Sequence, residues 1–279
     1  MGRRRSDSLH HLRHVDHLST TMSPTPSQSD DGEANVAFDD LYDLAGPGRY
    51  YAQLGRTGYR IPSVVADVVR ERFTSVRDPG RPLHVLDLAC GYGFNGALLL
   101  HGMPIDEVFG GDTPSSAGSE LCDGGADIHL VGLDIACNAV RYAVQAGLVH
   151  EGFTDDLTAG PPGAACAVAL SSIDLVIESG AIGQLYVPCF TAILDAADRP
   201  SFVYCPRIDV DQGPVDELWQ RRGYECQTLR AAEPYRRPLD AEEAAMVTSA
   251  AMRLGRSVDE SIVDGYITVD VRLARPAVR

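Results

Sequence analysis

Lysine is absent from this chain of 279 residues, because all 24 of its basic residues are arginine. A Schiff base with a carbonyl compound or with pyridoxal phosphate requires a lysine amine. The phosphate-binding loop of Walker-type nucleotidases and the nucleotide site of protein kinases also require a lysine. The absence of lysine therefore excludes these chemistries.

Paired cysteines and long apolar runs are also lacking. The seven cysteines include no Cys-x-x-Cys pair and are odd in number, so neither a disulfide framework nor a metal site is expected. No apolar run reaches about 18 residues, and the basic start lacks the apolar segment of a secretory signal. We therefore expect a cytoplasmic protein with no membrane partner.

Basic residues are fewer than acidic ones: 39 acidic and 24 basic residues give a formal net charge of -15. Such a chain offers phosphate groups no electrostatic footprint, so we expect no nucleic-acid partner. Hydrophobic residues make up 44% of the sequence, enough to bury a full core at this length. The oligomeric state cannot be read from these features.

The first 37 residues differ in composition from the rest. They are rich in histidine and serine and show no sustained periodicity, so we expect a disordered tail, and Met22 is an alternative start. The remainder, 38–279, is predicted to form a single domain. It has an N-terminal helical lid at 38–80 and a helical insertion near 240–260.

Strands and helices are predicted to alternate along this domain. Strands are expected at 83–88, 128–134, 173–177, 201–205, 225–229 and 266–273, and helices at 61–72, 95–102, 137–146, 188–197, 215–222 and 240–254. Residues 110–127 have the composition of a loop insertion. The alternation predicts an α/β fold with a doubly wound, mostly parallel sheet, whose ligand site lies at the carboxyl ends of its strands.

The most informative segment runs from His84 to Gly96. A short apolar strand ends in Asp87, and Gly91 and Gly93 then lead into a helix whose first N–H groups have no intrahelical partner. The spacing Gly91-x-Gly93-x-x-Gly96 formally matches the dinucleotide-binding fingerprint. A carboxylate facing the loop would however repel a pyrophosphate, and it suits a cationic ligand group.

A second acid, Asp134, ends the next predicted strand. Its two oxygens can accept hydrogen bonds from both hydroxyls of a ribose, and Ile135 beside it could pack on adenine. The alternative is a charge that interacts with the dipole of the following helix. Asp134 lies 47 residues after Asp87, whereas the acid of a compact dinucleotide-binding unit follows after roughly 20 residues. The ligand-binding interpretation therefore requires that residues 110–127 form an insertion outside this unit.

The pattern Asp87-x-Ala89-x-Gly91-x-Gly93 resembles motif I of the class I S-adenosylmethionine-dependent methyltransferases, with alanine at the first glycine position. The resemblance is to the small-molecule type found in actinobacteria. It extends to Tyr50-Tyr51, Tyr59 to Pro62, Val131 to Tyr142, Asp155-Asp156-Leu157 and Ser179 to Gly183. It implies a Rossmann-like, doubly wound, mostly parallel seven-stranded sheet with S-adenosylmethionine as the cofactor.

The resemblance also implies roles for single residues. Asp87 would lie beside the methionyl amino group, and Asp155 or Asp156, with Leu157 as apolar neighbour, would hold the adenine amino group. Residues 154–156 could equally form an ordinary polar turn. The strand that ends near Ser179 would face the sulfonium, and Tyr51 would belong to a lid over the cofactor or simply pack in the core.

The predicted activity is methyl transfer to a hydroxyl, carboxylate or amine of a small molecule in secondary metabolism. For a hydroxyl acceptor a base within hydrogen-bond reach is needed, and Glu178 is the first candidate, although it could instead hold backbone amides. Two alternatives stay open: a nicotinamide-dependent oxidoreductase, and a protein that binds S-adenosylmethionine without transferring its methyl group.

Overall fold

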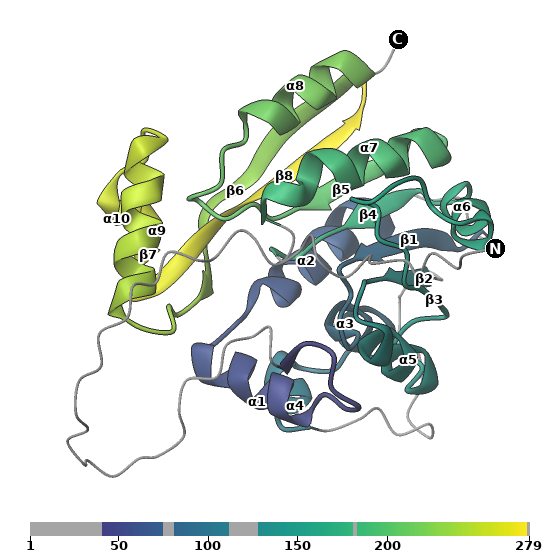
Figure 1. The fold of residues 1–279 in the computed structure, drawn as a ribbon, viewed down its shortest axis with the longest axis horizontal. Coiled ribbons are helices and arrows are strands. Elements are labelled where there is room, and N and C mark those ends of the chain that lie inside the picture. The colour runs from purple at the N-terminus through teal and green to yellow at the C-terminus, as the bar shows by residue number, and fades with distance from the viewer. Residues whose placement is uncertain (1–40, 75–80, 112–127, 181–182, 278–279) are drawn as a thin grey trace, which may run out of the picture. The chain divides into compact units, whose positions relative to one another are not determined.

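The computed structural model describes residues 41–74, 81–111, 128–180 and 183–277. Their strands form one sheet in the order β3-β2-β1-β4-β5-β8-β6, and β7 pairs with β8 (Figure 1). The strands are β1 Leu83–Leu88, β2 Ile128–Leu133, β3 Glu151–Phe153, β4 Leu175–Ile177, β5 Ser201–Tyr204, β6 Tyr224–Arg236, β7 Ile262–Val263 and β8 Tyr266–Pro276.

The sheet is mostly parallel. Strands β3, β2, β1, β4 and β5 pair in parallel, and β8 runs antiparallel to both β5 and β6. The main path of the sheet thus has the predicted seven strands, and the two-residue β7 adds an eighth at one side. The chain order reverses direction at β1, which has β2 on one side and β4 on the other, so β1 ends at the topological switch point.

Helices cover both faces of the sheet (Figure 1). They are α1 Gly48–Thr57, α2 Ile61–Val69, α3 Phe94–His101, α4 Ile105–Phe109, α5 Cys137–Gln145, α6 Ala164–Leu170, α7 Tyr186–Ala196, α8 Gly213–Arg222, α9 Ala241–Arg253 and α10 Val258–Ser261. A π-helical turn, Arg70–Thr74, continues α2, and a 3-10 turn, Gly183–Leu185, precedes α7.

Two apolar cores, one on each face, follow from the alternation of side chains along the strands. In β1, Val85 belongs to the core that α2, α3 and α5 cover, and Leu86 belongs to the core under α6, α7 and α8. Asp87 is the next residue and points to the same face as Val85. It is held at the carboxyl end of the central strand, at the edge of the first core.

The predicted α/β fold is confirmed, and most predicted elements lie within a few residues of the observed ones. The helix predicted at 61–72 ends at Val69, and the strand predicted at 225–229 extends to Arg236. Helices α4 and α6 and strands β3 and β7 were not predicted as elements, and α1 and α10 fall within the predicted helical lid and helical insertion, for which no separate helix bounds were given there. The tail at 1–37 and most of the insertion at 110–127 lie outside the described residues, and the predicted domain boundaries stay predictions.

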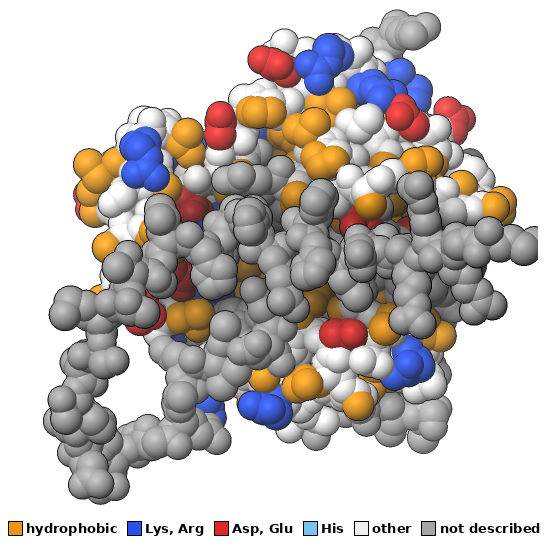
Figure 2. All heavy atoms as spheres, viewed as in Figure 1, with side chains coloured by type: hydrophobic (Ala, Val, Ile, Leu, Met, Phe, Trp, Pro, Cys, Tyr) orange, Lys and Arg blue, Asp and Glu red, His pale blue; other side chains and the backbone are white. Residues whose placement is uncertain are grey.

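The α8 end of the molecule carries acidic and arginine side chains side by side (Figure 2). Arg221 pairs with Glu217, and Arg222 pairs with Asp195 of α7. Among the helices of the described residues, none is both long enough and apolar enough to cross a membrane.

Candidate functional site

The turn from β1 into α3 is built from residues with positive φ. Ala89, Gly91 and Gly93 have φ angles of 59°, 50° and 90°. An alanine in this region costs roughly 1–2 kcal/mol, and it stands at the position where the methyltransferase motif has glycine. At Gly91 a side chain would find open space, with only the Tyr42 hydroxyl as near as 3.9 Å, so the loop backbone leaves room for a ligand there.

Two buried acceptors at this turn have no hydrogen-bond partner among the described residues. Asp87 Oδ1 accepts a hydrogen bond from Asn95 Nδ2 at 2.8 Å, whereas Asp87 Oδ2 and Asn95 Oδ1 accept none. Asp87 is fully buried and Asn95 nearly so. Because buried polar atoms are otherwise almost always paired, two unpartnered oxygens on two hydrogen-bonded side chains indicate a place for a ligand with several N–H donors.

Burial also changes the charge of this site. The pKa of Asp87 is raised to about 7, mainly because the carboxyl is desolvated. The hydrogen bond from Asn95 lowers this pKa, and the nearby charges of Asp134 and Glu178 raise it. A cation bound to Asp87 would stabilise its ionised form. The site is therefore suited to a cationic group and unsuited to an anion.

Asp134 follows β2 and faces the same loop. Its Oδ2 accepts hydrogen bonds from Gly91 N at 2.8 Å and from the Tyr42 hydroxyl at 2.6 Å, and its Oδ1 accepts one from Ala136 N at 2.9 Å. Burial is the largest cause of the raised pKa of Asp134. The carboxylate thus joins the ends of β1 and β2.

The segment Tyr42 to Leu44, which we name the N-terminal strap, is tied across these two strand ends. Besides the Tyr42 contact, Asp43 Oδ1 accepts a hydrogen bond from Asn138 N at 2.7 Å. The Tyr92 hydroxyl donates to Leu44 O at 2.8 Å. All three residues of the strap therefore contact the two loops that would hold a nucleoside.

Two tyrosines hold the backbone where β4 ends. The Tyr59 hydroxyl donates to Ser179 O at 2.9 Å and lies 3.1 Å from Ser179 Oγ, and the Tyr235 hydroxyl donates to Gly180 O at 3.0 Å. Their rings meet edge to face, with centroids 5.4 Å apart. Burial raises the pKa of both hydroxyls, so they act as neutral donors at physiological pH.

Glu178, the candidate base, is fully buried at the end of β4. Its Oε2 accepts hydrogen bonds from the Tyr186 hydroxyl at 2.8 Å and from Cys205 N at 3.2 Å. These contacts join β4 to α7 and to the residue after β5. The arrangement matches the alternative in which this carboxylate holds neighbouring groups in place.

The residues predicted to contact adenine differ in whether their side chains are free to meet a ligand. Ile135 is 51% exposed beside Asp134, as an apolar surface for a ring would be. Asp155 Oδ1 accepts from Gly163 N, and Asp156 Oδ1 accepts from Thr158 N. Asp156 therefore makes a local turn contact, and Asp155 contacts the residue before α6. Their role toward adenine stays a prediction.

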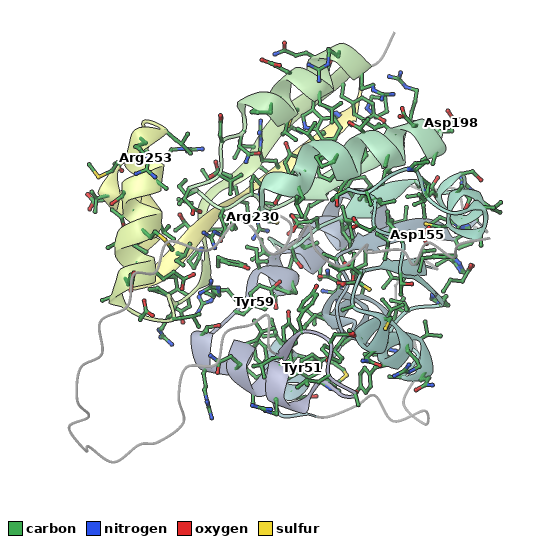
Figure 3. The ribbon with its side chains drawn as sticks, in the orientation of Figure 1. Tyr51, Tyr59, Asp155, Asp198, Arg230 and Arg253 are labelled. Carbon is green, nitrogen blue, oxygen red and sulfur yellow. The ribbon has the colours of Figure 1, made fainter. Side chains whose placement is uncertain are left out.

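Tyr51 lies beneath the loop on α1, below Tyr59 in Figure 3. Its hydroxyl donates to Tyr92 O at 3.0 Å, and its ring lies 4.5 Å from that of Phe94. Tyr51 is buried, so in this structure it packs against the inner side of the glycine loop.

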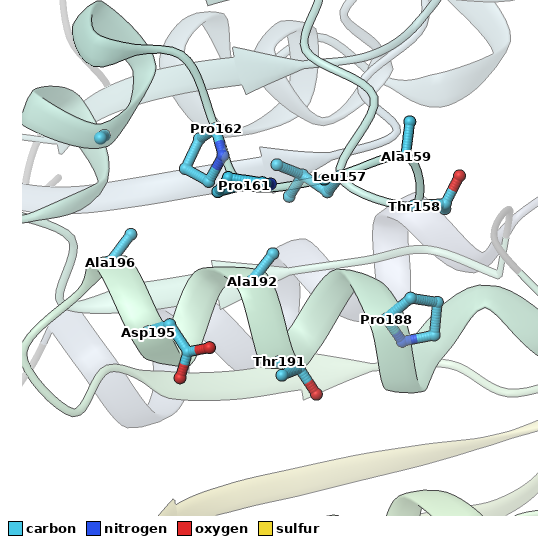
Figure 4. Close-up of a pocket in the computed structure, with 12 residues that line it drawn as sticks. Leu157, Thr158, Ala159, Pro161, Pro162, Pro188, Thr191, Ala192, Asp195 and Ala196 are labelled. Atoms are coloured by element: carbon cyan, nitrogen blue, oxygen red, sulfur yellow. The ribbon is translucent and has the colours of Figure 1, made fainter.

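A groove of about 600 Å³ lies between the loop after β3 and the outer side of α7 (Figure 4). Leu157, one of the predicted adenine contacts, lines it together with Pro161, Pro188 and Ala192. The lining includes neither Asp87 nor Asp134, so this groove is distinct from the glycine loop.

Several residues of the site were not predicted from the sequence. Asn95 could have been found, because it lies in the first turn of the predicted helix and can reach back to Asp87. Tyr42 and Tyr235 come from distant segments, and their contacts depend on the tertiary fold. In the described residues, no three histidine, cysteine or carboxylate side chains gather into a metal-binding group.

Comparison with known proteins finds no matching family model and no matching curated protein. Solved structures do match. A TehB-like S-adenosylmethionine-dependent methyltransferase from Corynebacterium glutamicum is 15% identical, with a TM-score of 0.46 over 81% of this chain and 95% of that chain. The O-methyltransferase TomG from Streptomyces achromogenes, solved with S-adenosylmethionine, is 12% identical, with a TM-score of 0.42 over 89% and 92% of the two chains.

A protein with another activity also matches. The [4+2]-cyclase SpnF is 13% identical, with a TM-score of 0.45 over 84% of this chain and 96% of that chain. Because these identities and TM-scores are low, the fold and the chemistry have to be argued from this chain's own topology and residues. The chain has the Rossmann-like α/β fold predicted for class I methyltransferases.

Proposed function

We propose that this chain binds S-adenosylmethionine at the turn between β1 and α3 and transfers its methyl group to a hydroxyl, carboxylate or amine of a small molecule in secondary metabolism. One observation carries the proposal: within the described part of the chain, Asp87 Oδ2 and Asn95 Oδ1 are buried acceptors without a partner, beside a glycine loop at the switch point of the sheet. The methionyl ammonium has the donors and the charge that these two oxygens lack.

The other parts of the cofactor find matching groups nearby. Asp134 would accept the ribose hydroxyls, and the exposed Ile135 would offer apolar surface to the adenine. The competing nicotinamide interpretation requires a pyrophosphate at the same loop. The buried Asp87 carboxyl disfavours a pyrophosphate at this loop, because the negative charge of its ionised fraction would repel the phosphate groups.

The bound cofactor would supply an electrophilic methyl group on a sulfonium. The protein's own contribution is then mainly alignment, since Tyr59 and Tyr235 fix the backbone of Ser179 and Gly180 through their hydroxyls. Tyr186 and Cys205 hold the Glu178 carboxylate. An amine acceptor needs no base from this set, whereas a hydroxyl acceptor would need one.

Calorimetric titration with S-adenosylhomocysteine tests the proposed function. We expect wild-type protein to bind it and Asp134→Ala to bind at least tenfold more weakly, because a carboxylate hydrogen bond is worth about 1.5–3 kcal/mol. Asp195→Ala, which removes an exposed carboxylate from α7, is the control and should bind as wild type does. If S-adenosylhomocysteine binds, a screen with labelled methyl donor identifies the acceptor. Binding of NAD(H) in place of S-adenosylhomocysteine would contradict the proposal.

The N-terminal strap should oppose cofactor binding through Tyr42. A carboxylate offers about four acceptor positions, and Asp134 already uses three of them, for Tyr42, Gly91 and Ala136. Two ribose hydroxyls need two positions, so the Tyr42 hydroxyl has to leave. We therefore expect Tyr42→Phe to bind S-adenosylhomocysteine several-fold more tightly in the same titration, and weaker binding would show that Tyr42 stays and contacts the cofactor.

The variant Glu178→Gln tests whether Glu178 positions its neighbours or acts as a general base. The glutamine amide oxygen has two lone pairs and can accept from both donors at the Oε2 position, so we expect a loss of no more than about 1 kcal/mol in the free energy of unfolding. If Glu178 only holds these groups, turnover of a hydroxyl acceptor should keep the wild-type pH profile. Loss of the profile's acidic limb at unchanged stability would instead assign Glu178 as the base, because protonation of a general base lowers the rate at low pH.

A further inference from the structure

Two arginine side chains lie against the ring of one tyrosine, Tyr266, at the start of β8. The guanidinium carbon of Arg60 lies 4.3 Å from the ring centroid, and that of Arg237 lies 4.7 Å from it. Arg60 Nη2 also donates to the Tyr266 hydroxyl at 3.0 Å. The tyrosine is buried and both arginines are exposed. We name Arg60 and Arg237 the arginine pair.

The arginine pair differs from the arginines around it. Arg236 is bound by the carboxylate of Glu243 at 2.5 and 2.9 Å, and Arg207 is bound by Asp209 at 2.6 and 2.9 Å. Within the part of the chain that the structure describes, neither member of the arginine pair contacts a carboxylate. Their guanidinium donors are therefore available to an anion.

The positions of the two arginines are fixed by the backbone. Arg60 N donates to Tyr235 O at 3.1 Å, and Arg237 N donates to Thr57 O at 2.7 Å. Gly58, with a φ of 65°, lets the Tyr266 hydroxyl approach, since a Cβ there would lie 2.9 Å from it. The two guanidinium groups are thus held against one ring by two chain segments that are hydrogen-bonded to each other.

These two segments also reach the end of β4. Arg60 follows Tyr59, whose hydroxyl contacts Ser179, and Tyr235, whose hydroxyl contacts Gly180, comes two residues before Arg237. The arginine pair therefore lies next to the elements that border the proposed transfer site. Asp87, Asp134 and Glu178 make the interior of that site acidic, so an anionic group would be held at its border.

We propose that the arginine pair binds an oxyanion, a carboxylate or a phosphate, carried by the methyl acceptor. This inference rests on the proposed function, and it adds a substrate class to it. The planar guanidinium group presents N–H donors in a fork that matches carboxylate and phosphate oxygens, and a bound anion would also relieve the repulsion between two like charges. The acceptor would then be a small acid or phosphate ester whose other end reaches Ser179 and Gly180.

Inorganic phosphate at constant ionic strength is the first probe. Its binding is followed through the NMR signals of the arginine Nε–H groups in wild type, Arg60→Gln, Arg237→Gln and Arg253→Gln. Arg253, at the end of α9, is the matched control because it is also exposed (Figure 3). We expect each substitution in the pair to weaken phosphate binding at least tenfold and the control to leave it unchanged. No saturable binding, or an equal effect of all three substitutions, would overturn the proposal.

A second titration distinguishes the acceptor's anion from the carboxylate of the cofactor. S-adenosylhomocysteine and methylthioadenosine, which lacks the amino-acid end, are compared in the same four proteins. We expect no change in either affinity. If Arg60→Gln or Arg237→Gln weakened S-adenosylhomocysteine tenfold and left methylthioadenosine unchanged, the pair would belong to the cofactor and the proposal would be wrong. Failure of wild type to bind either nucleoside would contradict the proposed function alone, because the phosphate result does not depend on it.

Discussion

Asp87→Asn is expected to weaken S-adenosylhomocysteine binding about 30-fold or more. The substitution keeps the shape of the side chain and removes the charge that the buried site offers to an ammonium group. Removing one partner of a buried, hydrogen-bonded charge pair costs about 2–5 kcal/mol, and each tenfold in affinity corresponds to about 1.4 kcal/mol. Calorimetric titration at pH 8 measures the loss.

The same substitution should stabilise the ligand-free protein. The pKa of Asp87 is raised from 3.8 to about 7, so the folded state holds this proton more tightly than the unfolded state. The resulting stabilisation is complete below about pH 4 and is lost as the pH rises to about 7. At pH 8, Asp87→Asn should therefore exceed wild type by as much as roughly 4 kcal/mol, at about 1.4 kcal/mol for each pKa unit.

Urea unfolding of both proteins at a series of pH values tests this gain. The difference between them should grow between about pH 4 and pH 7 and then stay constant. Asp195→Asn, on an exposed residue, is the control and should show no such growth. A variant that is less stable than wild type at pH 8 would mean that Asp87 is ionised and paired within the protein.

Gly96→Ala is expected to prevent stable folding. A Cβ at position 96 would lie 1.7 Å from the carbonyl oxygen of Leu148 and 2.7 Å from its carbonyl carbon. These are backbone atoms, so the clash can be relieved only by moving α3 away from the segment that leads into β3. We expect a loss of more than about 4 kcal/mol in the free energy of unfolding, because overpacking against backbone atoms is one of the few mechanisms that cause losses of this size.

Gly48→Ala is the matched control, because no atom lies within 4 Å of a Cβ at that position. We expect it to change stability by less than about 0.5 kcal/mol. Chemical denaturation followed by circular dichroism compares the two variants. Equal unfolding midpoints for Gly96→Ala and wild type would contradict the packing described for α3.

Much of the fold could be predicted because periodic apolar residues dominate in long elements. The strand that carries Asp87 and the helix behind Gly93 were predicted almost to the residue, since buried strands and glycine turns have strong local signals. Helix α6 was missed because its alanines, next to two prolines and a glycine, do not show a clear periodicity. Strand β3 has only three residues, too few for any period to be visible.

The candidate site was predicted in part: contacts that follow from the order of the strands could be predicted, and contacts that depend on the tertiary fold could not. Asp87 and Asp134 could be placed together because the carboxyl ends of adjacent parallel strands meet at one edge of the sheet. The contact of Tyr42 with Asp134 joins residues 92 positions apart and depends on a segment with no periodic pattern. Likewise, the two unpartnered oxygens at Asp87 and Asn95 become evident only once every other donor has been placed.

The central claim is that Asp87 and Asn95 receive the ammonium group of S-adenosylmethionine. It is tested most directly by calorimetric titration of wild type with S-adenosylhomocysteine near pH 6.5, in buffers of different ionisation enthalpy, with Asp87→Asn as reference. Because the pKa of Asp87 is about 7, binding of a cation should ionise this carboxyl and release part of a proton, and affinity should fall as the pH is lowered further. Proton release that is equal in wild type and Asp87→Asn, or binding that does not depend on pH, would contradict the claim.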